Sequence, residues 1–108
     1  MQILLDENIP TKVKFDFGKG FEVMTVRDMG WLGKKNGELL GLLTFNGFSF
    51  FITIDKNLQY QQNLEKFDIK IILLLASDNK HQTLQPFIEK VKELLKGGQY
   101  KKFNTVSL

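Results

Sequence analysis

The first eight residues, MQILLDEN (residues 1–8), begin as an apolar run and end in three polar residues. Residues 2–5 have no helical spacing, and Asp6, Glu7 and Asn8 stop the run. A short apolar run bounded by polar residues is typical of a buried β-strand. In an open parallel α/β sheet, ligands bind just outside the carboxyl ends of the strands. Asp6 and Glu7 would stand at that edge, either in a functional site or in an ordinary acidic loop before the next helix.

The rest of the chain alternates between predicted helices and strands. Asn8 and Asn36 are suitable N-cap residues for the first two helices. Helices are expected at 9–17, 36–45 and 83–96, with a short one ending near Lys66, and further strands at 21–26, 48–54, 69–75 and 103–107, the last at a sheet edge. This alternation predicts an α/β fold, a three-layer α/β/α sandwich with a mainly parallel central sheet, formed by residues 1–108 as a single domain.

Composition excludes several kinds of site. The chain has no cysteine, so it can form neither a disulfide nor a thiolate metal site, and its single histidine, His81, rules out a His-rich metal site. The net charge of +3 permits a nucleic-acid partner without requiring one. No apolar run approaches the roughly 18 residues of a membrane span, and the chain begins directly with a predicted strand. We therefore expect a cytoplasmic protein with no signal peptide and no membrane partner.

Three predicted strands end in acidic or amide residues: Asp6 follows the first strand, Asp55 follows the strand at 48–54, and Asp78 and Asn79 follow the strand at 69–75. In addition, Glu38 lies in the first turn of the helix at 36–45. Helices that follow parallel strands begin at the carboxyl edge, so the carboxylates of Asp6, Glu38 and Asp55 are expected to converge. Converging carboxylates raise one another's pKa, and a divalent cation removes that penalty. Oxygen-only ligands select Mg²⁺ or Mn²⁺, which suits hydrolysis of a phosphodiester without a nucleophilic side chain.

Each of these residues also has an ordinary structural interpretation. A carboxylate in a first helical turn, as at Glu38, is stabilised by the helix dipole alone. Asn8, Asn36 and Asn79 can act as helix caps, and Asp28 can support a turn before a glycine. His81 is interpreted as a surface residue before a helix. Only the coincidence of Asp6, Glu38 and Asp55 at one edge therefore indicates a site.

Three segments stand in order along the chain: MQILLDENIP at 1–10, KKNGELL at 34–40 and TIDKNLQYQQN at 53–63. Together they resemble a bacterial family of small PIN-like proteins of unassigned function, which are similar to the toxins of type II toxin–antitoxin pairs. The resemblance covers nearly the whole chain. It implies a PIN-like α/β/α sandwich with metal-dependent ribonuclease activity, Mg²⁺ or Mn²⁺ as cofactor, RNA as substrate and a small antitoxin protein as partner. A homodimer is left open.

PIN domains carry acidic residues after the first strand, on an early helix and after a middle strand. Asp6, Glu38 and Asp55 match these positions, so the resemblance implies that they are the catalytic and metal-binding residues. Neighbouring residues are expected to support them: Glu7, Asn8, Asn57 and Asp78. Many relatives have a second aspartate where this chain has Asn57, and Asp78 is the candidate to replace it.

The segment after Asp55 can bind substrate, because amide and ammonium groups can donate to phosphate or to bases, or it can be an ordinary solvated loop. Its candidate substrate-binding residues are Lys56, Tyr60, Gln62 and Asn63. Lysines elsewhere near the predicted edge can contact phosphate or remain ordinary solvated side chains. They are Lys12, Lys14, Lys34 and Lys35.

Three functions remain open from the sequence. The first is a Mg²⁺- or Mn²⁺-dependent ribonuclease, acting as the toxin of a toxin–antitoxin pair. The second is a catalytically weak PIN-like module that binds RNA or protein. The third is a flavodoxin-like phospho-acceptor domain, which also has paired acids after the first strand and an aspartate after the third. That class requires a hydroxyl after the fourth strand, where Ser77 could serve, and a lysine after the last strand, which this chain lacks.

Overall fold

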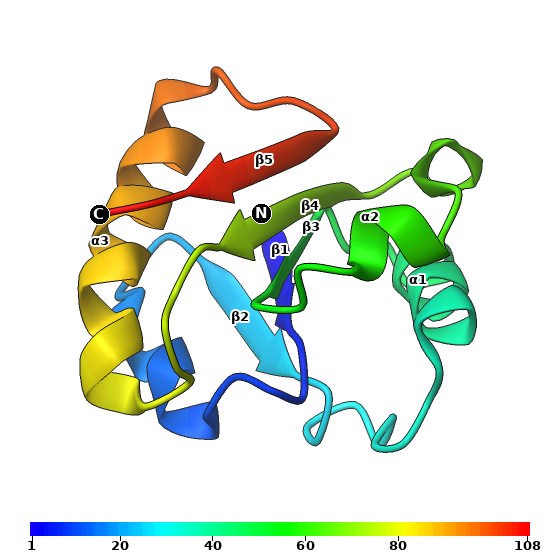
Figure 1. Ribbon diagram of the computed structural model, residues 1–108, viewed down its shortest axis with the longest axis horizontal. Helices are drawn as coiled ribbons and strands as arrows, with labels where there is room; N and C mark the ends of the chain where they lie inside the picture. Colours follow the sequence, from blue (N-terminus) through cyan, green and yellow to red (C-terminus); the bar gives the residue numbers. More distant parts are fainter.

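The computed structural model describes residues 1–108 and contains five strands and several helices (Figure 1). The strands are β1 (Gln2–Leu5), β2 (Glu22–Thr25), β3 (Phe50–Thr53), β4 (Lys70–Leu74) and β5 (Phe103–Val106). The α-helices are α1 (Asn36–Phe45), α2 (Leu58–Gln61) and α3 (His81–Gly97), and the 3₁₀ helices are η1 (Thr11–Asp16) and η2 (Leu64–Lys66). None of the helices combines the length and the apolar character that a membrane crossing requires.

All five strands are parallel and lie in the order β2-β1-β3-β4-β5. The chain moves outward from β1 to β2 and then returns past β1 to β3, so the direction of winding reverses between β1 and β3. In doubly wound sheets this reversal is the topological switch point, and ligands bind at the carboxyl ends of the two strands that flank it. The predicted edge position of the last strand is confirmed, because β5 pairs only with β4.

Helices cover both faces of the sheet, which confirms the three-layer α/β/α sandwich. In Figure 1, α3 and η1 lie on one side of the sheet and α1 and α2 on the other. A hydrophobic core lies on each face of the sheet, and alternate residues of β1 contribute to the two cores. Ile3 and Leu5 pack on the α3 side, whereas Leu4 packs on the α1 side. Strands β3 and β4 are almost wholly buried, because helices cover both faces of the sheet.

The first helix differs from its prediction. An α-helix at 9–17 capped by Asn8 is wrong, because the helical segment is the 3₁₀ helix η1, preceded by Pro10 and without a side-chain cap. Pro10 has an extended backbone with ψ of 139°, and a proline also disfavours helical geometry in the residue before it. Three apolar residues of this segment, Ile9, Val13 and Phe17, are nevertheless all buried.

The helix at 36–45 has its predicted bounds, but its predicted cap is absent. Lys35 occupies the N-cap position and makes no side-chain capping bond, while Asn36 is the first helical residue. At the other end, the backbone N–H of Asn46 donates to the Leu42 carbonyl at 2.9 Å, and Gly47 has a φ of +78°. Asn46 and Gly47 therefore terminate this helix.

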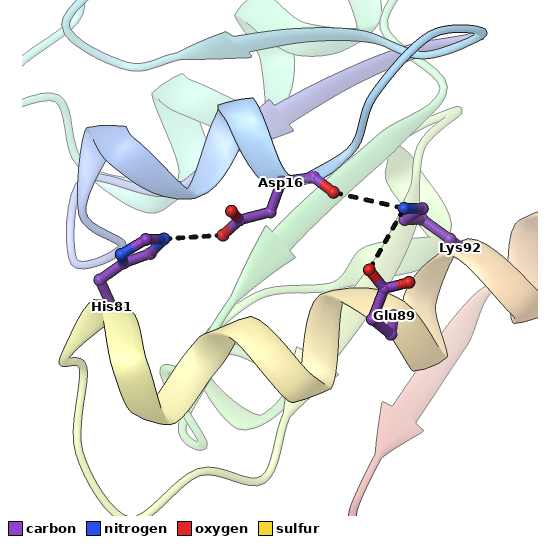
Figure 2. A network of polar contacts seen from close by, with 4 residues as sticks. All are labelled: Asp16, His81, Glu89 and Lys92. Carbon is purple, nitrogen blue, oxygen red and sulfur yellow. Dashed lines mark hydrogen bonds and ion pairs between the residues drawn. The ribbon is translucent and has the colours of Figure 1, made fainter.

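His81 begins α3 instead of preceding it, and it is half-buried rather than free on the surface. Its Nε2 atom lies 2.8 Å from the Asp16 Oδ2 atom in η1. Figure 2 shows Lys92 completing this link: its Nζ donates to the Asp16 carbonyl oxygen at 3.3 Å and to Glu89 Oε1 at 3.4 Å. These contacts join η1 to α3 across positions far apart in the chain, which explains why local sequence could not predict them.

Two adjacent glycines at the end of α3 give a matched test of the C-cap. Gly98 has a φ of +71°, and its N–H donates to the Leu94 carbonyl, whereas Gly97 is helical with open space around it. We expect Gly98→Ala to lower the free energy of unfolding by about 1 kcal/mol, because a Cβ disfavours the left-handed conformation. Gly97→Ala should raise it by roughly 0.5 kcal/mol, because alanine is the better helix former. Urea unfolding of both variants measures this, and changes of the same sign would contradict it.

Candidate functional site

Thr53, the last residue of β3, joins the two strands at the switch point. Its hydroxyl donates to Asp6 Oδ2 at 2.7 Å and accepts from the backbone N–H of Asp55 at 3.0 Å. The backbone N–H of Asp6 also donates to the Ile52 carbonyl of β3 at 2.9 Å. Both bonds join Asp6 to β3, and the one from the Thr53 hydroxyl holds the Asp6 carboxylate at the β1–β3 boundary.

Asp6 is the most buried carboxylate of this edge, with only 8% of its surface exposed. Burial raises the pKa of the Asp6 carboxyl above its ordinary value of 3.8, and the charges of Asp55 and Glu7 raise it further. Hydrogen bonds from the Thr53 hydroxyl and the Glu7 N–H act in the opposite direction and lower that pKa. The fold therefore holds Asp6 where its negative charge is poorly solvated. A nearby cation would reduce the free-energy cost of that charge.

Asp55 lies beyond the end of β3 and is half-buried. One of its carboxylate oxygens, Oδ1, accepts from the backbone N–H of Asn57 at 3.0 Å, which closes a tight turn. Its charge is close enough to raise the pKa of Asp6. The Thr53 hydroxyl lies between the two residues, because it bonds both the Asp6 carboxylate and the Asp55 backbone N–H.

Glu38 is not brought into this pair. Its side chain is 58% exposed at the start of α1, and its Oε1 atom lies 3.8 Å from Lys34 Nζ. No three His, Cys, Asp or Glu side chains lie together in an arrangement that could hold a metal ion. The three-carboxylate cluster expected from the sequence is therefore not formed, and the site consists of two carboxylates.

The four predicted supporting residues have different roles. Glu7 Oε1 accepts from the Gly33 N–H at 3.2 Å, which ties the β2–α1 loop to the Asp6 loop. The backbone N–H of Asn57 closes the turn at Asp55, while its side chain is exposed. Asp78 accepts from the Lys80 N–H at 2.9 Å, in a turn before α3. The Thr83 hydroxyl and that N–H lower the pKa of the Asp78 carboxyl, so the structure assigns Asp78 to this turn.

Asn8 is the supporting residue with an unexplained atom. Its Oδ1 is buried and has no hydrogen-bond partner. Its backbone carbonyl accepts from Asn79 Nδ2 at 3.1 Å, which joins the loops after β1 and β4. Buried polar oxygens normally have a partner, so this loop has an acceptor that a water molecule or a cation would satisfy.

The predicted substrate-binding residues lie on the segment after β3. Lys56 is exposed, and Tyr60 on α2 is 81% exposed, which leaves its ring free for stacking. Gln62 is half-buried beside the first turn of α1, close to Gly37. Asn63 Oδ1 accepts from the Glu65 N–H at 3.3 Å and so caps η2. Asn63 therefore has a structural role, while Lys56 and Tyr60 remain available to a ligand.

Carboxylate and amide oxygens are the ligand types that Mg²⁺ and Mn²⁺ favour. Asp6 and Asp55 offer carboxylate oxygens, and the loop after β1 contains the unpartnered amide oxygen of Asn8. Mg²⁺ is commonly bound through one or two protein carboxylates, with water and substrate phosphate as its other ligands. Asp6 and Asp55 are therefore the residues that would hold the ion.

Thr53 is the site residue that sequence reasoning missed. It is fully buried, although it is the only polar residue of β3. Threonine is common in strands, so its presence alone did not single it out. The available signal was a polar side chain at the carboxyl end of an otherwise apolar strand, two residues before Asp55.

Asp28, which was interpreted as a turn residue, has that role. Its Oδ2 accepts from the Thr25 N–H and from Lys14 Nζ, each at 2.9 Å, and its own N–H donates to the Thr25 hydroxyl. Lys14 and the Thr25 N–H lower the pKa of the Asp28 carboxyl. Asp28 therefore stabilises the loop that follows β2.

The raised pKa of Asp6 predicts a pH-dependent effect of Asp6→Asn on the metal-free protein. An unfolded Asp6 ionises above about pH 3.8, whereas the folded state resists ionisation, so wild type loses stability as the pH rises through this window. The variant has no such loss. We therefore compare the melting temperature of Asp6→Asn with that of wild type in EDTA. We expect the variant's melting temperature, relative to wild type, to be higher at pH 7 than at pH 3. An equal effect at both pH values would contradict a poorly solvated charge at Asp6.

No model of a known protein family matches this chain, and no match was found among curated proteins or solved structures. The resemblance to PIN-like proteins therefore rests on the short motifs of the sequence. The fold, and the pairing of Asp6 with Asp55, rest on the structure itself.

Proposed function

We propose that this protein is a Mg²⁺- or Mn²⁺-dependent ribonuclease of PIN type that cleaves single-stranded or looped RNA. The observation that supports this most directly is the pairing of Asp6 and Asp55 at the carboxyl ends of β1 and β3, where the sheet reverses its winding. The motif resemblance extends the proposal to a toxin that acts in the cytoplasm and is restrained by a small antitoxin.

The residues of the site have separate roles in this proposal. Asp6 and Asp55 hold the cation, and Thr53 orients Asp6 through its hydrogen bond to Oδ2. A bound divalent cation supplies Lewis-acid polarisation of the phosphodiester and lowers the pKa of water. Lys56 can contact a phosphate, and the exposed ring of Tyr60 can stack on a base. Unpaired RNA is favoured as substrate, because only there are the bases free to stack.

Purified protein on a mixed pool of single-stranded RNA tests the activity, with Mg²⁺ or Mn²⁺ and with EDTA. We expect cleavage only with the divalent cation. Attack by water leaves a 5′-phosphate and a 3′-hydroxyl, whereas attack by the ribose 2′-hydroxyl leaves a 2′,3′-cyclic phosphate. Cyclic products, or cleavage that continues in EDTA, would contradict the proposal.

Thermal melts provide a readout that does not depend on cleavage. A ligand that binds only the native state stabilises it by mass action, so millimolar Mn²⁺ should raise the melting temperature of wild type. Asp6→Asn and Asp55→Asn should each abolish that rise. A Mn²⁺-dependent rise without any RNA cleavage would favour the alternative of a PIN-like module that binds RNA or protein without catalysis.

The strand order supports one second candidate. The order β2-β1-β3-β4-β5 is that of flavodoxin-like domains, in which an aspartate after the third strand can accept a phosphoryl group. Ser77 follows β4 as that class requires, but Lys101 and Lys102 precede β5 and no lysine follows it. Labelling with radioactive acetyl phosphate, with Asp55→Asn as control, tests this candidate. Label at Asp55 would favour it over the ribonuclease.

A further inference from the structure

A small cavity of about 170 Å³ lies between the loops that follow β1 and β2. Asp6 itself lines it, together with Glu7, Thr11, Thr25 and Arg27. Whatever occupies the cavity therefore lies next to the carboxylate of the proposed site. The larger surface hollow, about 690 Å³ between α3 and β5, contains none of the predicted site residues.

Arg27 is the only arginine in the chain, and the structure leaves its guanidinium without a partner. The four ion pairs of the protein involve lysines and His81, but not Arg27. The adjacent carboxylate, Asp28, is already occupied by Lys14 at 2.9 Å and by the Thr25 N–H. An exposed, unpaired guanidinium at the wall of a cavity is well suited to bind a planar or tetrahedral oxyanion through two parallel hydrogen bonds.

One hydroxyl group adds to this donor set. The Thr25 hydroxyl does not, because it is buried, accepts from the Asp28 N–H and helps to lower the pKa of the Asp28 carboxyl through a hydrogen bond. Thr11 is exposed at the start of η1, and its hydroxyl makes no hydrogen bond within the protein. The cavity is smaller than the roughly 300–1,000 Å³ of pockets that enclose a whole ligand. It can therefore admit one phosphate group of a chain that crosses the surface, but not an entire nucleotide.

The two carboxylates that line the cavity oppose the binding of a phosphate group. Asp6 and Glu7 would repel an anion, and the Glu7 side chain is only partly compensated by the Gly33 N–H. A divalent cation held by Asp6 and Asp55 would compensate this repulsion. Phosphate binding beside Arg27 should therefore depend on that cation.

We propose that the cavity is a phosphate subsite, in which Arg27 binds a backbone phosphate of the RNA next to Asp6 when a divalent cation is present. This inference rests on the proposed function and adds a substrate-positioning residue to it. Arg27 thereby orients the RNA strand across the loops after β1 and β2, while Lys56 and Tyr60 contact it beyond β3.

Uridine 5′-monophosphate is a suitable probe, because it carries a terminal phosphate and has no phosphodiester to hydrolyse. Titration followed by NMR should shift the Arg27 side-chain signal and the Thr25 amide in Mg²⁺, but not in EDTA. Arg27→Gln should weaken binding roughly tenfold to a hundredfold, the usual contribution of a charged hydrogen bond. Arg27→Lys should weaken it less, because lysine keeps the charge but loses the two-point geometry.

Lys19→Gln is the matched control, because it removes one exposed positive charge at the opposite edge of the sheet, before β2. It should leave binding unchanged. Equal weakening by Lys19→Gln and Arg27→Gln, or no binding of the probe to wild type at 10 mM, would overturn the subsite. The activity assay separates the two proposals: Mg²⁺-dependent RNA cleavage with an unchanged KM in Arg27→Gln would overturn the subsite alone. Arg27-dependent binding of the probe without any RNA cleavage would overturn the ribonuclease alone.

Discussion

Asp6→Asn should lower the rate of Mg²⁺- or Mn²⁺-dependent RNA cleavage at least about a hundredfold, because loss of the cation removes several kcal/mol of transition-state stabilisation. The same variant should be at least as stable as wild type in EDTA at neutral pH, since a poorly solvated charge has been removed. Loss of activity in a well-folded protein would separate a role in the site from a role in folding. Initial rates on a labelled single-stranded RNA, with melting temperatures on the same samples, measure both.

Three further substitutions sharpen this result. Asp55→Asn should lower the rate to a similar extent, because Asp55 is the second carboxylate of the pair. Glu38→Gln should lower it by less than about tenfold, since the Glu38 side chain is exposed and pairs with Lys34. Asp68→Asn, at an exposed position before β4, is the control that should match wild type. Equal losses in Glu38→Gln and Asp6→Asn would show that the three-carboxylate site expected from the sequence forms when the ligands are bound.

Thr53→Val should lower the free energy of unfolding at pH 7 by about 1–3 kcal/mol, the usual cost of leaving buried polar groups without partners. Valine has nearly the same shape as threonine, but it can neither donate to Asp6 Oδ2 nor accept from the Asp55 N–H. For a protein of this size, each 1 kcal/mol corresponds to roughly 4–8 °C in the melting temperature. The substitution should also slow RNA cleavage, because Asp6 loses the bond that orients it.

Thr53→Ser is the matched variant for this prediction. It keeps the hydroxyl and removes only a buried methyl group, so it should keep the orientation of Asp6 and most of the activity. Urea unfolding at pH 7 without metal, together with cleavage rates, compares the two. If Thr53→Ser lost as much activity as Thr53→Val, packing by the methyl group would be the important contribution of Thr53, and its hydroxyl would not.

Local sequence determined most of the architecture. The mainly apolar runs at 2–5, 48–54 and 69–75 predicted strands that are buried in the structure, because a strand covered on both faces needs apolar residues at most positions. The helix predicted at 83–96 likewise corresponds to α3, in which Phe87, Ile88 and Val91 are buried. The carboxyl ends of parallel strands share one edge, so the strand ends alone placed Asp6 and Asp55 on the same side of the sheet.

Only the tertiary structure decided the strand order and the composition of the site. Which strand lies beside β1 depends on pairings between distant residues, and it is this pairing with β3 that brings Thr53 to Asp6. Glu38 was expected in the cluster because its helix begins at the same edge, yet the direction of its exposed side chain depends on a loop whose path local sequence does not specify. The burial of Asp6 and the open guanidinium of Arg27 arise in the same way, because solvation and ion pairing depend on neighbours that only the folded chain brings together.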